Sequence, residues 1–292
     1  MTRVSVCNYR SVLYFTVIVL IAFQGAAGGK DQKMKPEELV AKHLESIGTP
    51  EARAAIKTRE GVGKGQIVFI QPSPGNLLAR GEMVSDGKMM RISMLFDGSP
   101  NYPTEQFAFD GNRANTSQIR PGVRVNMASF AYTYDVLLKE GLLGGTMTTA
   151  WALLDVAGRQ PKLEYGGLKK VEGRQLHELR YRAKKGAGEL QIWLRFDAET
   201  FRHVMSEYRL TQPANMANTP SESSAQHDTI YNIKELFDEF RTVDGVTFPT
   251  SWKLKYSREG GGPTALAEYS IVLVQVAHNK PLDTKAFALI EK

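Results

Sequence analysis

Apolar residues after position 35 first recur with the spacing of a helix. The run from Leu39 to Ile47 is apolar on one face, with Pro36 before it and Gly48 after it. Proline is favoured in the first turn of a helix, and glycine just after the last turn. The pattern predicts a helix that Gly48 ends, followed by a second short helix over residues 50–57.

From Gly65 onward the pattern changes to short strands separated by turn signals. Five strands are predicted in this half, over residues 66–70, 77–84, 88–96, 105–109 and 113–119. The connections contain Asp-Gly pairs, which favour the positive φ of tight hairpin turns, at 86–87, 97–98 and 110–111. Strands joined in this way form an antiparallel meander.

A helical insertion is predicted at about residues 122–158. Residues 125–143 are rich in Met, Phe, Tyr and Leu, and residues 146–156 have the character of a further helix. Six more strands are predicted after it, over residues 174–183, 189–197, 201–210, 229–241, 246–256 and 265–276. Alternation, as in Ile192, Leu194 and Phe196, gives the sheet one apolar and one mostly polar face. The helices are available to cover the apolar face.

The first 28 residues have the parts of a secretory signal peptide. Arg3 and Arg10 make the start basic, an apolar run extends from Val12 to Phe23, and small residues follow at 25–29. A run of roughly a dozen apolar residues is short for a membrane span, which needs about 20. We predict a signal peptide over 1–28 and a single domain over 29–292, with an uncleaved membrane anchor as the alternative.

Composition limits the kinds of covalent link, metal site and partner that we expect. The one cysteine, Cys7, precedes the apolar run and would leave with the signal peptide, so no disulfide or thiolate site is expected in the rest. The formal charge of +6 would fall to +4, because Arg3 and Arg10 leave too. Basic residues are mixed with acidic ones, and no nucleic-acid-binding motif is present, so we expect no nucleic-acid partner.

No catalytic or metal-binding pattern stands out. Histidines at 43, 177, 203, 227 and 278 have no ligand-pair spacing, and no G-x-S-x-G motif occurs. Gly61, Gly63 and Gly65 precede a predicted strand, so they read as a flexible approach to the sheet rather than a phosphate loop. We therefore expect no catalytic residue, no metal and no cofactor.

The order of several short motifs resembles that of a known superfamily. The chain is similar to the periplasmic lipoprotein carriers LolA and LolB and to regulators of the MucB and RseB type. The stretches that carry this resemblance are Glu105–Gly111, Val171–Arg174, Leu176–Leu179, Ile192–Asp197, Phe240–Pro249 and Asn279–Asp283 with Phe287.

This resemblance implies an α+β fold. It would be a curved antiparallel sheet, an incomplete β-barrel of roughly 11 strands, with helices over a concave apolar face. It also implies an apolar cavity under the helices, where each buried methylene of a ligand gains about 0.8 kcal/mol. Candidate cavity residues, for each of which ordinary core packing is the alternative, are Met127, Phe130, Trp151, Ile192, Trp193, Leu194, Trp252, Leu254, Tyr256 and Tyr269.

Three functions follow from this picture. The first is a non-catalytic periplasmic carrier that binds the acyl chain of a lipid or an acylated protein. The second is an envelope sensor or scaffold of the same fold that binds a protein partner, which would suit an uncleaved inner-membrane anchor. The third is an enzyme with a site assembled from distant residues. A large apolar cavity would favour the first, and a filled core with an exposed apolar patch the second.

Overall fold

The computed structural model describes residues 1–2, 34–214 and 227–290, and from Met34 onward the chain forms one compact unit. The predicted signal peptide lies outside the described residues, apart from Met1 and Thr2. The α-helices are α1 (Pro36–Ile47), α2 (Pro50–Ala55), α3 (Asn126–Thr133), α4 (Val136–Lys139) and α5 (Val156–Arg159). Single 3-10 turns are η1 (Gly145–Met147), η2 (Ala152–Asp155) and η3 (Thr284–Phe287). In the described part of the chain, no helix has the length and apolarity needed to cross a membrane.

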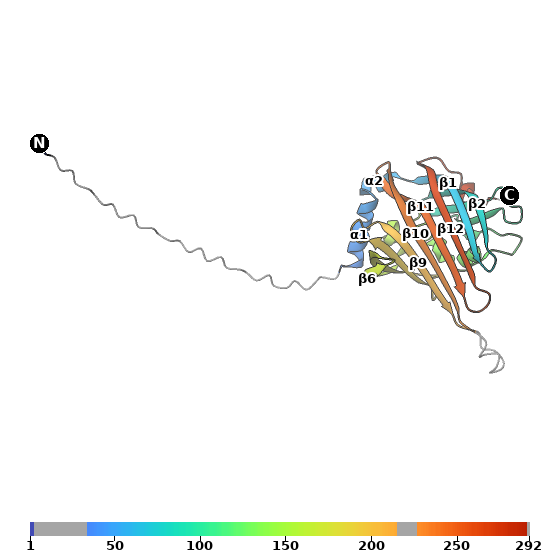
Figure 1. Cartoon of the computed structure of the whole chain (residues 1–292). Coiled ribbons are helices and arrows are strands. Elements are labelled where there is room, and N and C mark those ends of the chain that lie inside the picture. Colours follow the sequence, from blue (N-terminus) through green and yellow to red (C-terminus); the bar gives the residue numbers. More distant parts are fainter. Residues whose placement is uncertain (3–33, 215–226, 291–292) are drawn as a thin grey trace. The chain divides into compact units, whose positions relative to one another are not determined.

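The strands form a single antiparallel sheet with two free edges (Figure 1). In chain order they are β1 (Thr58–Gln71), β2 (Gly75–Asp86), β3 (Met89–Leu95), β4 (Thr104–Phe109), β5 (Ala114–Thr116), β6 (Lys162–Val171), β7 (Arg174–Arg182), β8 (Gln191–Asp197), β9 (His203–Gln212), β10 (Thr229–Val243), β11 (Val246–Glu259) and β12 (Ala265–His278). In space the order is β5-β4-β3-β2-β1-β12-β11-β10-β9-β8-β7-β6. Two meanders are thus joined where the first and last strands pair.

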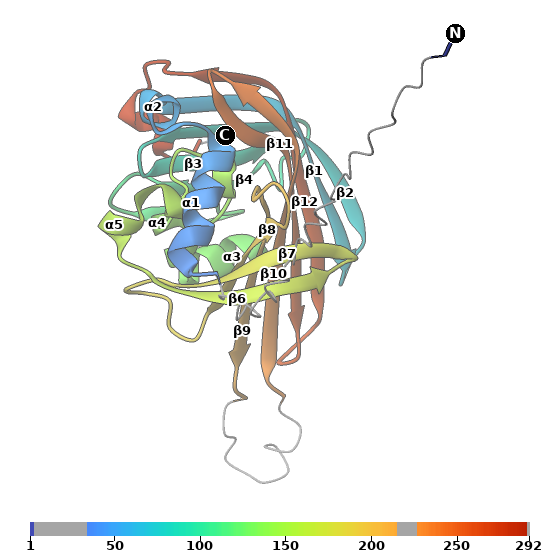
Figure 2. The same cartoon turned by 90° about the vertical axis from the view of Figure 1, so that its left-hand side faces the viewer.

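The sheet curves around the helices, which lie on its concave side (Figure 2). The expected curved antiparallel sheet with helices over its apolar face is therefore confirmed, with 12 strands among the described residues. Two of the three predicted Asp-Gly hairpins occur, with φ values of 53° at Gly87 in the β2–β3 turn and 94° at Gly111 in the β4–β5 turn. Gly98 instead lies in the longer connection between Leu95 of β3 and Thr104 of β4. The β10–β11 turn has the same pair, Asp244-Gly245.

Strand β6 was not predicted. It is an edge strand, and it contains two adjacent glycines, three lysines and no residue that is fully buried. The register of its pairing with β7 shifts between Tyr165 and Gly167, and this interrupts the two-residue alternation of its side chains. Alternation of apolar and polar residues is what marks a strand in a sequence. An edge strand that buries few side chains shows almost no such alternation.

The three glycines before Gln66 are part of β1, so a flexible approach to the sheet is the wrong interpretation of them. A Cβ atom at Gly63 would lie 1.9 Å from the carbonyl oxygen of Val272 in β12, and one at Gly61 would lie 2.9 Å from the Leu273 side chain. These glycines let two strands approach closely. The predicted helix over 146–156 is also wrong: that stretch consists of the end of η1, a bend and a turn, η2 and the first residue of α5.

Candidate functional site

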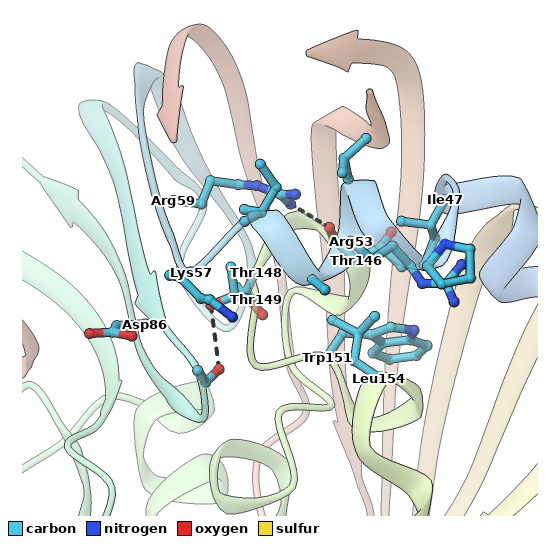
Figure 3. Close-up of a pocket in the computed structure, with 15 residues that line it drawn as sticks. Ile47, Arg53, Lys57, Arg59, Asp86, Thr146, Thr148, Thr149, Trp151 and Leu154 are labelled. Atoms are coloured by element: carbon cyan, nitrogen blue, oxygen red, sulfur yellow. Dashed lines mark hydrogen bonds between the residues drawn. The ribbon is translucent and has the colours of Figure 1, made fainter. Parts of the chain in front are cut away.

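A pocket of about 430 Å³ lies where α2, the start of β1, the β2–β3 turn and residues 146–154 meet (Figure 3). Its size is within the range of small-molecule sites. One wall is apolar and consists of Ile47, Ile56, Trp151, Leu154 and Val246. The rest is polar and includes Arg53, Lys57, Arg59, Asp86, Thr146, Thr148 and Thr149. The pocket is thus amphipathic, with three cationic side chains and one acidic side chain.

Local sequence places α2 above the pocket. Pro50 begins the helix, and the hydroxyl of Thr49 accepts a hydrogen bond from Ala52 N at 3.2 Å, as in a capped N-terminus. From the last turn of α2, the Arg53 guanidinium donates to the carbonyl oxygen of Leu44 at 2.6 Å and to that of Gly48. Arg53 therefore joins α2 to the carboxyl end of α1.

Arg59, in the second position of β1, is a buried cation that is 3% exposed. Its Nη1 donates to the carbonyl oxygens of Thr146 at 2.8 Å and Met147 at 2.9 Å, and its Nε donates to Nε2 of His278 at 2.9 Å. The guanidinium carbon also lies 4.0 Å from the centre of the Phe248 ring. No carboxylate pairs with Arg59 in the described part of the chain, and burial lowers the pKa of Arg59 to about 9.

A buried glutamate fixes the loop that forms the pocket's far wall. Glu235 of β10 accepts hydrogen bonds from Gly144 N at 2.8 Å, Trp252 Nε1 at 2.7 Å and the Tyr208 hydroxyl at 2.6 Å. Burial raises the pKa of Glu235 to about 7, although the three donors oppose that shift. The network joins the sheet to the loop just before Thr146.

Trp151 and two histidines lie beneath the pocket. Trp151 Nε1 donates to Nε2 of His43 at 3.0 Å, and Nδ1 of His43 donates to the carbonyl oxygen of Phe201 at 3.0 Å. His203 stacks on Trp151 with ring centres 4.4 Å apart. Burial lowers the pKa of His43 to about 4 and that of His203 well below its usual range, so both are neutral at pH 7. They are packed, hydrogen-bonded core residues rather than acid–base groups at a surface.

The ten candidate residues do not surround one cavity. Nine of them are at most 3% exposed and belong to the main core: Met127, Phe130, Trp151, Ile192, Leu194, Trp252, Leu254, Tyr256 and Tyr269. Trp193 alternates with Ile192 and Leu194 and therefore lies on the outer face of the sheet. Only Trp151 lines the pocket of Figure 3.

Some of the remaining candidate residues line other hollows. Tyr256 and Tyr269 line a space of about 260 Å³ between β1, β12 and the start of α3. Ile192 and Trp193 border an open hollow of about 510 Å³ near the β6 edge, where most of the lining is charged or polar. Much of the concave face is therefore filled by side chains, and among these hollows, all lined by described residues, the pocket beneath α2 combines an apolar wall with buried charge.

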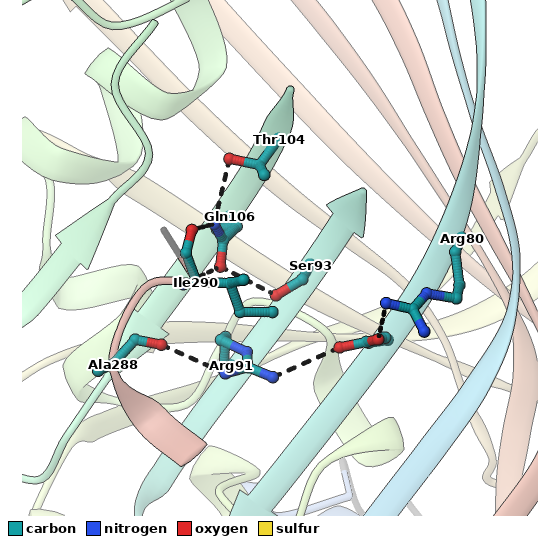
Figure 4. Close-up of polar contacts among 8 residues, drawn as sticks. Arg80, Arg91, Ser93, Thr104, Gln106, Ala288 and Ile290 are labelled. Carbon is teal, nitrogen blue, oxygen red and sulfur yellow. Dashed lines mark hydrogen bonds and ion pairs between the residues drawn. The ribbon is translucent and has the colours of Figure 1, made fainter. Parts of the chain in front are cut away.

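The outer face of β2, β3 and β4 is covered by the segment that contains η3 (Figure 4). Phe287 is 2% exposed in this segment. The Gln106 side chain donates to the Ile290 carbonyl oxygen at 2.8 Å and accepts from Ile290 N at 2.9 Å, as a neighbouring strand would. Arg91 Nη1 donates to the carbonyl oxygen of Ala288 at 3.3 Å. This segment closes a surface that the curved sheet would otherwise expose.

No group of three or more His, Cys, Asp or Glu side chains within 1–2, 34–214 and 227–290 is placed to hold a metal ion. Sequence reasoning missed Arg59, Lys57 and Thr146 as pocket residues. An arginine inside a strand was the only available signal, and it lay in a stretch that was not predicted to be strand.

Solved structures similar to this chain include members of the superfamily expected from the sequence. An outer membrane lipoprotein-sorting protein domain from Vibrio parahaemolyticus is 10% identical, with 87% of this chain and 97% of that chain covered and a TM-score of 0.44. A LolA superfamily protein from Nitrosomonas europaea is 11% identical, with 88% and 98% covered and a TM-score of 0.44. The MucA/MucB complex from Pseudomonas aeruginosa matches at 8% identity, with 83% and 99% covered and a TM-score of 0.22.

These structures are of the LolA and MucB proteins that the sequence resembles. No protein-family model matches the chain, and no curated protein matches it in sequence.

Proposed function

We propose that this chain is a non-catalytic periplasmic carrier, exported by its signal peptide, that binds the acyl chain of a lipid or an acylated protein. The observation that carries the proposal is the pocket of about 430 Å³ with the apolar wall of Ile47, Ile56, Trp151, Leu154 and Val246. Each methylene buried there contributes about 0.8 kcal/mol before the cost of association is subtracted. Ten methylenes would supply roughly 8 kcal/mol, which exceeds the lower end of that cost, about 4 kcal/mol.

The chemistry around the pocket supports binding rather than turnover. Arg59 uses Nε and Nη1 in fixed hydrogen bonds, and the buried histidines below are neutral and packed. Lys57 and Asp86 have no ion-pair partner among the described residues. General acid–base catalysis needs a titratable group in contact with the substrate, whereas His43 and His203 are held in the core by hydrogen bonds.

The test is uptake of an acyl probe with one pocket-blocking variant and one matched control. Leu154 lines the pocket and is 40% exposed, whereas Leu168 on the β6 edge is 51% exposed and lies outside the pocket. We expect a fluorescent acyl probe to bind saturably to the native chain and the Leu168→Arg variant, and at least tenfold more weakly to Leu154→Arg. If the native chain binds no acyl probe, and none co-purifies with it by native mass spectrometry, the carrier function is wrong.

A specific observation also favours the sensor or scaffold function. The concave core is filled, and aliphatic side chains stand exposed on the outer face of β1, β2 and β12: Val62, Leu78, Val272 and Val274, from 37% to 74% exposed. Exposed apolar patches of this kind mark surfaces for partners. A photo-crosslinking residue at Val274 would capture one discrete envelope protein if this function holds. Absence of a crosslinked partner in whole cells would contradict it.

A further inference from the structure

The polar side of the pocket beneath α2 carries an excess of positive charge close to a buried, unpaired hydroxyl. Arg53, Lys57 and Arg59 line it together with a single acidic residue, Asp86. Lys57 is exposed and forms no ion pair with the described residues. A buried cation without a carboxylate is costly unless other groups or a ligand stabilise it.

One end of the Arg59 guanidinium is free. Nε and Nη1 are engaged by His278, Thr146 and Met147, whereas Nη2 has no hydrogen-bond partner among the described residues. Nη2 is not sealed off by surrounding atoms, and Arg59 lines the pocket. The two N–H groups of Nη2 are therefore open to the pocket, held in place by the bonds that the other nitrogens make.

Arg59 is also held from behind. His278 accepts from Arg59 through Nε2 and donates through Nδ1 to Asp244 at 2.9 Å, so a fixed tautomer orients the guanidinium. Phe248 covers the flat face of the guanidinium. A rigid guanidinium with free donors is well suited to a carboxylate or a phosphate.

Thr146 supplies a second, independent observation. It is 5% exposed, it lines the same pocket, and its Oγ1 has no hydrogen-bond partner among the described residues. Buried hydroxyls in native proteins almost always have a partner, so an orphan in a pocket wall indicates a missing group. The backbone carbonyl of the same residue accepts from Arg59, so Thr146 adjoins the guanidinium, and its Oγ1 is sealed from the pocket in this side-chain conformation.

We propose that this pocket binds a single-chain amphiphile with an anionic head group. The carboxylate or phosphate lies at Arg59 Nη2 and accepts from Thr146 Oγ1 once that side chain turns toward the pocket. Lys57 lies at the mouth, and the chain lies along the apolar wall that includes Trp151 and Leu154. This inference rests on the proposed function and names the class of its ligand.

The experiment compares three 12-carbon probes by calorimetric titration: dodecanoate, monododecyl phosphate and the neutral 1-monododecanoylglycerol. We expect at least one anionic probe to bind tenfold or more tightly than the neutral one, and the two anionic arms show whether carboxylate or phosphate is preferred. Equal affinity for all three would overturn the anionic site and leave the carrier function standing. Binding of none of them would contradict the carrier function itself.

Variants separate a ligand contact from a structural role. Thr146→Val removes a hydroxyl that bonds nothing, so it should leave the fold as stable or more stable, and yet weaken anionic binding severalfold. Lys57→Gln should weaken anionic binding only, and the control Lys64→Gln, which changes an exposed lysine on the outer face of β1, should leave it unchanged. If Thr146→Val and Lys57→Gln both bind the anionic probes like the native chain, the proposal is wrong.

Discussion

Replacing Glu235 tests whether the buried network holds the pocket wall in place. Glu235→Ala removes the acceptor for three donors, but the Tyr208 hydroxyl can turn to the Leu142 carbonyl oxygen, which lies 3.1 Å away. Gly144 N–H and Trp252 Nε1–H then stay buried without an acceptor. At about 1–3 kcal/mol for each orphaned donor, the variant should lose roughly 2–6 kcal/mol of unfolding free energy.

Glu235→Gln is the matched control, because its geometry allows every bond to be kept. The amide oxygen can accept from Gly144 and Trp252, and the amide nitrogen can donate to Tyr208, whose own proton then goes to Leu142. We expect this variant to lie within about 1 kcal/mol of the native chain at pH 5, where the native carboxyl is protonated.

The two variants also differ from the native chain in their response to pH. The folded pKa of Glu235, about 7, lies above the ordinary value of 4.5, so its contribution is full below pH 4.5 and is lost as the pH rises through about 7. At 1.36 kcal/mol for each unit, the loss is on the order of 3 kcal/mol. Glu235→Gln should not show this loss.

Urea unfolding at pH 5 and pH 8, followed by tryptophan fluorescence, measures both effects. A cost below about 1 kcal/mol for Glu235→Ala would refute the role of the network.

Three further predictions concern the sheet and its covering segment. Gly63→Ala should unfold the chain or lower its melting temperature strongly, because the new Cβ meets the Val272 carbonyl oxygen. Gly75→Ala should be tolerated, because no atom lies nearer than 3.7 Å to its new Cβ, and equal melting temperatures of the two variants would contradict this. Phe287→Ala should speed amide hydrogen exchange at Ile290 without affecting β10, and uniform acceleration would show that the segment is not a separate cover. Burial raises the pKa of Glu105 to about 8, so native stability should fall as the pH rises through 8, and Glu105→Gln should remove that part of the fall; parallel pH curves in urea unfolding would contradict this.

Most of the sheet could be predicted because its strands carry local signals. Ile192, Leu194 and Phe196 alternate with polar or half-buried residues, and the structure buries all three on the concave side. The Asp-Gly turns require nothing beyond their own two residues. Strand β6, which was not predicted, lies at an edge and buries few side chains, so its sequence lacks the alternation of a half-buried strand.

The pocket could not be predicted because its contacts are distant in sequence. Arg59 meets a carbonyl 87 residues later and a histidine 219 residues later, and no periodic pattern reports such pairs. Trp151 is the one candidate from the sequence that lines the pocket. The other core candidates were equally large and apolar, and only packing distinguishes a filled core from a cavity wall.

The central claim, that an acyl chain binds beneath α2, is tested most directly by photolabelling. An acyl probe with a diazirine near its terminal carbon, irradiated with the native chain and digested, reports which residues the chain contacts. The account predicts labelling in the segment 146–154 and around Ile56, and loss of that labelling in Leu154→Arg. Labelling confined to the outer face around Val274, or labelling that Leu154→Arg leaves unchanged, would contradict it.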